Sequence, residues 1–352
     1  MRVAVVSMET THHRDTDATR RIERVAGLLS DAGHDVTIFC AQWWDGYRET
    51  IHEDGITYRG VTVTPTTPSF VTRLPALLAR QQPDVVHAAP TPPEIVLAAG
   101  AGAKLGRAPL VVEWFDDGAV PETRTGRLAI RRPELIVTPS ELVRTRVRER
   151  GAMDDQTTVI PESIDMDLVR ETEPREAVDV VYANRLDESA NVESLFLGLA
   201  ELRQKDWSAT IVGDGPQREA YERQAADLRI DDRVTFAGAC DRAERIGIYR
   251  GAHVFVQTAY RVNFATELLW ALSCGCVGIV EYQAESSAHE LIERRERSFR
   301  VTDPEELADR IVESADLERR TVDESFAEFD HENVRGTYED HYERLIGERG
   351  LL

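Results

Sequence analysis

The stretch VVYANRLDESANVESL (180–195) begins with an apolar run, passes through a polar turn, and continues into a helix that is predicted to start near Asn191. A short apolar run followed by a charged segment with helical spacing predicts one strand–loop–helix unit of a parallel sheet. The same order occurs in TIVGDGPQREAYERQA (210–225) and in VFVQTAYRVNFATELLWALSCGCVGIVE (254–281). Ligands of such sheets bind outside the carboxyl ends of the strands, so the loops within these three stretches are candidate ligand-binding segments.

Apolar runs of strand length recur along the whole chain in two series, which a polar stretch separates. The predicted strands are 2–7, 35–40, 84–88, 109–114, 134–139 and 158–161 in the first half, and 178–183, 208–213, 233–238, 253–258 and 276–281 in the second. The polar residues 162–177 contain Pro174 and are predicted to form a linker. We therefore predict an α/β fold with two Rossmann-like doubly wound domains that face each other across a cleft.

The predicted organisation is an N-terminal domain over residues 1–165, a C-terminal domain over 166–325 and a closing helix over 326–352. The closing segment carries an apolar stripe at helical spacing, made of Phe329, Val334, Tyr338, Tyr342 and Leu345. That stripe needs an apolar surface beyond its own neighbours, so we expect the helix to cross back and pack on the N-terminal domain.

The chain of 352 residues is acidic: 42 Lys plus Arg stand against 63 Asp plus Glu, and the formal net charge is −21. Such a balance fits a protein that avoids nucleic acid, because proteins bind nucleic acid through basic patches. It also fits a halophilic protein from a cell with molar internal salt, and the even spread of acids along the chain favours this second interpretation. The Debye length at molar salt is about 3 Å, so a phosphate-bearing ligand is not excluded.

Uncharged apolar runs, such as the one that includes residues 271–280, are shorter than a bilayer span, so no transmembrane helix is predicted. The first predicted strand starts at Arg2, with no signal-peptide pattern before it. The cysteines show neither the spacing of a metal site nor that of a disulfide framework; they are Cys40, Cys240, Cys274 and Cys276. These observations predict a reduced, cytoplasmic protein.

The three junctions of the second half supply the candidate ligand-binding residues. Free backbone N–H groups at helix starts, gathered at one sheet edge, suit a diphosphate. The residues at these junctions are Asn184, Arg185, Gly213, Asp214, Gly215, Asn263, Phe264 and Ala265. For Arg185 the alternative is an ordinary surface cation, and for the glycines at 213 and 215 it is a turn that any βα unit uses.

These segments, in this order, resemble the second domain of the GT-B glycosyltransferases, specifically the large retaining family four, whose motifs are roughly GRLxxxKN, GxGP, VxFxG and ExFGxxxxEAMAxGxPV. The first half resembles the family as well, in GHDVTIF (33–39), PDVVHA (83–88), TPSELVRTRVRERG (138–151) and VIPESID (159–165). The resemblance covers essentially the full length. It implies a transferase that moves a sugar from a nucleotide-sugar donor to an acceptor with retention of configuration, with no metal and no other cofactor.

The same resemblance implies that the C-terminal domain binds the nucleotide-sugar and that the N-terminal domain binds the acceptor, a glycan or a lipid-linked glycan. Arg185 occupies the position of the family's diphosphate-binding arginine. The family's second cation, a lysine, falls on Ala190, and its paired glutamates fall on Val262 and Trp270. Each lost charged hydrogen bond is worth about 1.5–3 kcal/mol, so this chain has either replacements or a different site.

Two acids are candidates for catalytic roles. Asp116 keeps its position in the family's vvtvHD pattern, although Phe115 replaces the histidine before it. Glu267 lies three residues before Trp270 on one helix face, and we predict that it takes over part of the work of the missing carboxylates. The alternative is that Glu267 only caps that helix.

Two histidines and a basic stretch complete the candidates. His12 and His13 follow the first strand and are predicted to face the acceptor; loop histidines without a role are the alternative. The arginine-rich region from Arg124 to Arg150 predicts a peripheral contact with the inner membrane face, and a solvated helix face is the alternative. Asp165-x-Asp167 imitates a metal-binding motif but lies in the predicted linker, so no metal is expected.

The leading hypothesis for function is therefore a glycosyltransferase. The alternative, from a different class, is a catalytically silent GT-B protein that binds a nucleotide or partners an active transferase, and it is motivated by the replacements at Ala190, Val262, Trp270 and Phe115. A nicotinamide-dependent dehydrogenase is disfavoured, because VVSMETTHHRD (5–15) lacks the GxGxxG fingerprint. Nucleic acid is not an expected partner.

Overall fold

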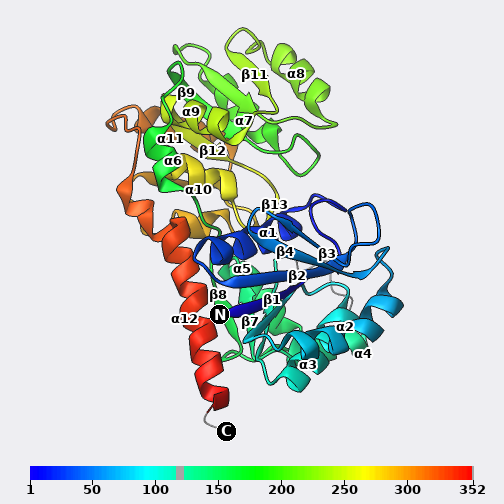
Figure 1. Cartoon of the computed structure of the whole chain (residues 1–352). Helices are drawn as coiled ribbons and strands as arrows, with labels where there is room; N and C mark the ends of the chain where they lie inside the picture. The colour runs from blue at the N-terminus through cyan, green and yellow to red at the C-terminus, as the bar shows by residue number, and fades with distance from the viewer. Residues whose placement is uncertain (116–122, 351–352) are drawn as a thin grey trace. The chain divides into compact units, whose positions relative to one another are not determined.

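The computed structural model of the chain describes residues 1–115 and 123–350. The chain folds into two compact units (Figure 1): unit 1 is Met1–Glu162 with His331–Leu352, and unit 2 is Ser163–Asp330. The chain thus leaves unit 1 at 162–163 and returns to it at 330–331, whereas the sequence predicts the changes at 165–166 and 325–326.

Unit 1 contains an eight-stranded sheet in the order β3-β4-β2-β1-β5-β6-β7-β8. Neighbouring strands are parallel except β3 and β4. The six strands predicted in the first half are confirmed. They are predictable because most of them are runs of buried apolar residues. The strands are β1 (Arg2–Val6), β2 (Asp35–Ala41), β3 (Thr50–Glu53), β4 (Ile56–Thr62), β5 (Val85–Ala88), β6 (Leu110–Glu113), β7 (Leu135–Thr138) and β8 (Thr157–Val159).

The hairpin of β3 and β4 at the edge of this sheet is not among the predicted strands. β3 is mostly exposed, and β4 mixes buried with half-buried residues, so neither strand is an uninterrupted apolar run. The turn between them is Asp54-Gly55, and both residues have positive φ. An Asp-Gly pair between two short strands is the local signal that reveals such a hairpin.

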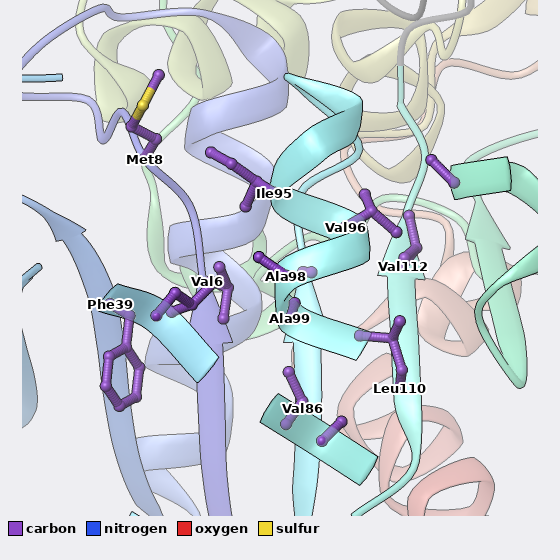
Figure 2. Packing of buried hydrophobic residues seen from close by; sticks show 14 of the residues in the cluster. Val6, Met8, Phe39, Val86, Ile95, Val96, Ala98, Ala99, Leu110 and Val112 are labelled. Atoms are coloured by element: carbon purple, nitrogen blue, oxygen red, sulfur yellow. The ribbon is translucent and has the colours of Figure 1, made fainter. Parts of the chain in front are cut away.

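Helices cover both faces of the unit 1 sheet and give it two apolar cores. Figure 2 shows one of them, where Ile95 and Val96 of α3 pack over Val86 of β5 and Val112 of β6. The helices of unit 1 are α1 (Asp17–Asp31), α2 (Thr67–Gln81), α3 (Pro93–Gly106), α4 (Arg124–Arg131), α5 (Glu141–Glu149) and α12 (His331–Gly350). Helix α1 begins with a capping box between Thr16 and Thr19, which fixes the end of the loop that follows β1.

The closing helix α12 packs on unit 1, as the sequence predicts. Val334, Tyr338, Tyr342 and Leu345 are buried in one core with residues of β1, β2 and α1. Phe329 does not belong to this stripe. It ends the short 3₁₀ helix η2 (Glu324–Phe329) of unit 2, where its ring stacks on Phe326 at 6.0 Å.

Unit 2 contains a six-stranded parallel sheet in the order β11-β10-β9-β12-β14-β16. All five strands predicted in the second half are confirmed, and the edge strand β16 is added. The strands are β9 (Val178–Ala183), β10 (Ala209–Val212), β11 (Val234–Gly238), β12 (Ala252–Gln257), β14 (Val277–Glu281) and β16 (Ser298–Val301). Because the chain runs outward from β9 in both directions, the topological switch point lies between β9 and β12, where ligands of such sheets bind.

The helices of unit 2 alternate with its strands: α6 precedes β9, and the helices after it follow strands. They are α6 (Met166–Glu171), α7 (Val192–Glu201), α8 (Arg218–Asp227), α9 (Arg242–Gly251), α10 (Thr266–Ser273) and α11 (Pro304–Ser314), with the 3₁₀ helix η1 (Ala288–Leu291). The predicted linker 162–177 is therefore partly wrong, because α6 lies inside it. Asp165 caps α6 by accepting the N–H of Leu168 at 2.8 Å, and Asp167 pairs with Arg170.

Candidate functional site

The loops that follow β9 and β10 lie in backbone contact at the carboxyl edge of the unit 2 sheet. The N–H of Asn184 donates to the Val212 carbonyl, and the N–H of Leu186 donates to the Asp214 carbonyl, both at 3.1 Å. A Cβ at Gly213 would lie 1.9 Å from the Asn184 carbonyl oxygen, so no side chain fits there. The glycine turn therefore has a structural reason: it lets the two loops approach each other beside the switch point.

Gly215, two residues further along the β10 loop, also allows the two loops to approach each other. A Cβ at this position would lie 2.3 Å from the Leu186 carbonyl oxygen. Between the two glycines, Asp214 accepts the N–H of Gly215 through its side chain at 2.8 Å. The two glycines and Asp214 thus shape the loop edge, and a ligand contact by these residues stays a prediction.

Arg185 projects from this edge at the carboxyl end of β9. Its side chain is 74% exposed, and its nearest acid is Asp187, whose Oδ2 lies 3.6 Å from Nε. The Asn184 side chain accepts the N–H of Arg185 at 2.8 Å and fixes the local backbone. An exposed guanidinium with one distant ion-pair partner is available to bridge two oxygens of an anion.

The loop after β9 is also tied to the end of β12. Asn191, in the left-handed conformation at φ 51°, donates through its amide to the Thr258 carbonyl at 3.0 Å. The Thr258 hydroxyl donates back to the Asn191 carbonyl at 2.6 Å. Ala190, at the position of the family's lysine, is buried, and its carbonyl accepts the Tyr182 hydroxyl at 2.5 Å.

The segment that precedes α10 is held by a second backbone contact. β13 (Arg261–Val262) pairs in parallel with β15 (Glu285–Ser286). Ser287 donates its N–H to the Val262 carbonyl and its hydroxyl to the Asn263 carbonyl, both at 2.8 Å. Phe264 and Ala265, the next two residues, are buried. The predicted residues 263–265 therefore lie in a fixed loop, at the start of α10.

Glu267 lies in the first turn of α10 and faces α9. Its carboxylate accepts from Arg242 at 3.2 Å, from Arg245 at 2.6 Å and from the Tyr249 hydroxyl at 2.6 Å. Burial, and next the Glu267 charge, raise the pKa of Tyr249, so this hydroxyl stays a donor. The capping alternative is wrong, because the N-cap position is Ala265 and no side chain caps the helix.

The carboxylate of Glu267 nonetheless keeps some contact with solvent, since 20% of its side chain is exposed. Its three donors fix its orientation, and the Arg242 guanidinium also lies 4.8 Å from the centre of the Trp270 ring. A carboxylate that is held by its neighbours and partly exposed has the form of a prepared binding group.

Glu281 is a second acid at this edge, which sequence reasoning did not single out. It ends β14, and its carboxylate accepts from the Ser194 hydroxyl and, at 2.8 Å, from the Gln283 amide. Burial raises the pKa of Glu281, and no cation pairs with it in the part of the chain that the structure describes. The sequence signal that points to Glu281 is its position directly after the apolar run CVGIV (276–280), at the carboxyl end of a predicted strand.

Among the candidates of unit 1, His12 and His13 lie together in the loop after β1. The His12 ring stacks on Trp43, with ring centroids 3.6 Å apart, and its Nε2 lies 3.6 Å from Oε2 of Glu53. The His13 ring is fixed by the N–H and hydroxyl of Thr10, and burial lowers the pKa of His13. Trp43 and Glu53 are partners that sequence reasoning missed.

Asp116 lies outside the described residues, and Phe115 before it is buried. The basic region from Arg124 to Arg150 divides into two parts. On α5, Arg144 and Arg148 both pair with Asp154, which fits a solvated face. On α4 the arginines are exposed beside Leu128, a residue that is itself 60% exposed.

Within residues 1–115 and 123–350, no cluster of three or more His, Cys, Asp or Glu side chains has the arrangement of a metal site. Over the same residues, no helix combines the length and the apolar character that crossing a membrane requires.

Comparison with known proteins covers both halves of the chain. Residues 18–162 match the family described as Glycosyl transferase 4-like domain, and residues 177–316 match the family described as Glycosyl transferases group 1. A search of curated proteins gave no significant match.

Solved structures match over nearly the full length. The Anabaena protein Alr3699/HepE in complex with UDP is 16% identical, with a TM-score of 0.76 over 98% of this chain and 100% of its own. Sucrose-phosphate synthase from Thermosynechococcus elongatus is 18% identical, with a TM-score of 0.67 over 100% and 98%. A glycosyltransferase from Rickettsia africae is 15% identical, with a TM-score of 0.70 over 99% and 96%. At these identities the likeness shows a shared fold. With both families matched in order along that fold, the chain is a glycosyltransferase of the GT-B type.

Proposed function

We propose that this glycosyltransferase takes a sugar from a nucleotide-sugar donor and transfers it to a glycan or lipid-linked acceptor, with retention of configuration and without a metal. The observation that carries the proposal is the exposed Arg185 guanidinium at the carboxyl end of β9, beside the backbone contact that Gly213 and Gly215 permit. Retention follows the resemblance to family four.

The donor site we propose is the edge of unit 2 formed by the loops after β9, β10 and β12. There, Arg185 binds the diphosphate. The N–H groups at the start of α10 add the partial positive charge of a helix N-terminus, which also attracts the diphosphate. The match to structures with UDP and with UDP-glucose supports a donor of this class. Asn184, Asp214 and residues 263–265 form the walls of this proposed site.

The sugar ring needs acceptors for its hydroxyl groups, and two carboxylates at this edge are suited to supply them. We assign the role to Glu267, because three donors orient its carboxylate and part of it stays exposed. Glu281 is the competing residue. Asp116 is proposed as a further catalytic residue on the acceptor side, by its position in the family's pattern.

The acceptor side also includes a proposed membrane contact for a lipid-linked acceptor at the inner membrane face. Helix α4 exposes Arg124 and Arg127 beside Leu128, and an apolar side chain among cations is suited to an anionic surface. Flotation with anionic vesicles tests this contact. Binding that survives the double change Arg124→Glu and Arg127→Glu contradicts it.

The silent alternative rests on the residues that occupy the family's ligand positions, Ala190, Val262 and Trp270. Calorimetric titration with a panel of nucleotide-sugars in molar KCl, combined with a test for slow donor hydrolysis, distinguishes the two functions. A transferase binds one nucleotide-sugar and hydrolyses it slowly. Binding of the bare nucleotide with no turnover of any donor supports the silent protein.

A further inference from the structure

A hollow of about 480 Å³ lies on unit 2, at the residues that lead into the edge strand β16. We call it the Arg294 hollow. Ligand pockets in proteins usually measure about 300–1,000 Å³, so a small molecule fits this volume. The titratable side chains that line the hollow are His289, Glu293, Arg294, Arg295, Glu296 and Arg300.

Four of these charged residues are exposed: Glu293, Arg294, Glu296 and Arg300. In the part of the chain that the structure describes, none of the four forms an ion pair, although they line the same hollow. Two guanidinium groups and two carboxylates thus lie close together without neutralising one another. They are available to a ligand that carries both an anionic group and hydrogen-bond donors.

The cationic wall of the hollow is partly fixed by its neighbours. The Arg295 guanidinium donates to Oε1 of Glu328 at 2.6 Å and lies 4.1 Å from the centre of the Phe326 ring. The Arg300 guanidinium lies 5.7 Å from the centre of the Tyr282 ring. Arginines that are held in this way lose less freedom when they bind a ligand.

His289 adds an oriented acceptor to the hollow. Its Nδ1 lies 3.0 Å from the Ser286 carbonyl oxygen, and its ring meets the Tyr282 ring edge-on at 5.3 Å. A carbonyl only accepts, so Nδ1 carries the hydrogen, and Nε2 of the neutral ring keeps its lone pair. Among the described residues, Nε2 has no hydrogen-bond partner.

We propose that the Arg294 hollow binds a sugar phosphate, as a ligand site beyond the proposed donor and acceptor sites. A phosphate monoester carries a charge of about −1.5 to −2 at neutral pH. Arg294 and Arg300 each bridge two of its oxygens. The sugar hydroxyls donate to the carboxylates of Glu293 and Glu296 and to Nε2 of His289.

The mixed charge of the hollow selects this class of ligand over its alternatives. A polyanion such as a nucleic acid, or an anionic membrane surface, is repelled by the two carboxylates. A neutral sugar leaves the two guanidinium groups without a partner. An anionic group joined to a ring of hydroxyls matches both halves of the lining.

The hollow is also separate from the donor site that we propose on unit 2. In the sheet, β12 and β14 lie between β9 and β16, and neighbouring strands are about 4.8 Å apart. Residues 292–297 enter β16 at the amino edge of this parallel sheet, whereas the donor loops leave β9, β10 and β12 at its carboxyl edge. A sugar phosphate in the hollow is therefore a second ligand of the unit.

Calorimetric titration of the full-length protein tests the proposal. The probes are glucose 1-phosphate, glucose 6-phosphate, mannose 6-phosphate, glucose and inorganic phosphate. We expect at least one sugar phosphate to bind at least about tenfold more tightly than glucose and than inorganic phosphate, because each of these two lacks one half of the contacts.

The variants Arg294→Gln and Arg300→Gln are each expected to weaken this binding at least about tenfold, the effect of one lost charged hydrogen bond. Arg229→Gln is the matched control and leaves the affinity unchanged. Arg229 is an exposed arginine of unit 2 with a left-handed backbone, at φ 57° against 66° for Arg294. Thermal melting checks that each variant is folded.

The double change Glu293→Gln and Glu296→Gln tests the acidic half of the lining. It is expected to narrow the preference for the sugar phosphate over inorganic phosphate. The reason is that the sugar hydroxyls lose two charged acceptors, while a phosphate loses two repulsive charges.

Any of five results overturns the proposal. No sugar phosphate binds; inorganic phosphate binds as tightly as the best sugar phosphate; the two hollow arginine variants bind like Arg229→Gln; or the double glutamine variant keeps the full preference. The fifth is loss of binding in Arg185→Ala, which places the probe at the donor edge. Because the titration contains no nucleotide-sugar, its outcome is independent of whether the proposed transferase function holds.

Discussion

Arg185 and Glu267 differ in the contacts that already hold them. The Arg185 guanidinium has one distant ion-pair partner, whereas the Glu267 carboxylate has two arginines and a tyrosine. A carboxylate accepts about four hydrogen bonds. Glu267 can therefore accept few hydrogen bonds beyond those from its structural partners. Its role toward a sugar hydroxyl depends on these remaining acceptor positions.

The change Glu267→Gln keeps the size of the side chain and removes its charge. We expect kcat/KM for the donor to fall at least about tenfold, or 1.4 kcal/mol, because a carboxylate binds sugar hydroxyls more strongly as charge develops in the transition state. We also expect a lower melting temperature, since Arg242 and Arg245 lose their charged partner. Steady-state kinetics and thermal melting measure the two effects.

Glu281→Gln is the comparison, because the two glutamates compete for the same role. Glu281 has neutral hydrogen-bond partners, so its replacement is expected to change stability less than that of Glu267. Loss of turnover with Glu281→Gln, together with normal turnover of Glu267→Gln, moves the role to Glu281 and contradicts our assignment.

At the scale of elements, the sequence predicts what is buried and misses what is half exposed. Every predicted strand exists, because a strand covered on both faces is an apolar run. The β3–β4 hairpin is missed because edge strands mix polar and apolar residues, and α6 because the linker 162–177 carries no apolar periodicity beyond one short turn.

The candidate site is predicted in part, for a related reason. Arg185 and the glycine turn are local motifs, so the sequence places them at the edge of unit 2. The partners of His12 are not local: Trp43 lies in the loop after β2 and Glu53 ends β3. Likewise, the donors to Glu267 come from α9, 18 to 25 residues earlier in the chain. Such contacts depend on tertiary packing, which a local pattern does not encode.

The contact between the β9 and β10 loops depends on Gly213. Its φ is 126°, and a Cβ would lie 1.9 Å from the Asn184 carbonyl oxygen. Gly213→Ala is therefore expected to lower the free energy of unfolding by at least about 2 kcal/mol and to weaken nucleotide-sugar binding. Urea denaturation and calorimetry measure these effects.

Gly336 of α12 is the matched control for that change. A Cβ at this position has no atom within 4 Å, and the backbone is helical. Gly336→Ala is expected to raise the free energy of unfolding by about 0.5–1 kcal/mol. Equal effects of the two substitutions would show that the backbone contact at Gly213 does not hold the loops together.

For the molecule as a whole, a buried charged network joins α12 to the sheet of unit 1. The Arg21 guanidinium binds Oε1 of Glu113 at 2.7 Å and the Tyr338 hydroxyl at 2.9 Å, and Tyr338 donates to Oε2 of Glu113 at 2.8 Å. His87 lies between Glu113 and Tyr342. Because partners on α1, β5, β6 and α12 meet here, the network specifies where the returning helix packs.

This network makes the stability of the protein depend on pH. Burial alone raises the pKa of Glu113, but Arg21 and His87 outweigh it and lower the pKa from 4.5 to about 2. A carboxylate whose pKa is lower in the folded than in the unfolded state stabilises the fold at pH values above the pKa of the unfolded state. This contribution, roughly 3 kcal/mol, is lost as the pH falls from about 4.5 toward 2. Denaturation in urea at a series of acidic pH values measures it.

Glu113→Gln removes this titration. We expect the variant to be less stable by roughly 3 kcal/mol at pH 7, because buried Arg21 then keeps Glu162 as its one charged partner among the described residues. We also expect its stability to fall less steeply than that of the wild type below pH 4.5. Glu219→Gln, at an exposed acid of α8, should match the wild type. Parallel acid dependence in wild type and Glu113→Gln would contradict the assignment to this network.

The central claim is that the chain uses Arg185 at the edge of unit 2 to turn over a nucleotide-sugar. The most direct measurement is the release of nucleoside diphosphate from a panel of nucleotide-sugars in molar KCl, for the wild type and for a folded Arg185→Ala variant. We predict release from at least one donor by the wild type, and a kcat/KM at least tenfold lower in the variant, since a lost charged hydrogen bond costs about 1.5–3 kcal/mol. Release at equal rates by both proteins, or no release from any donor, would contradict the claim.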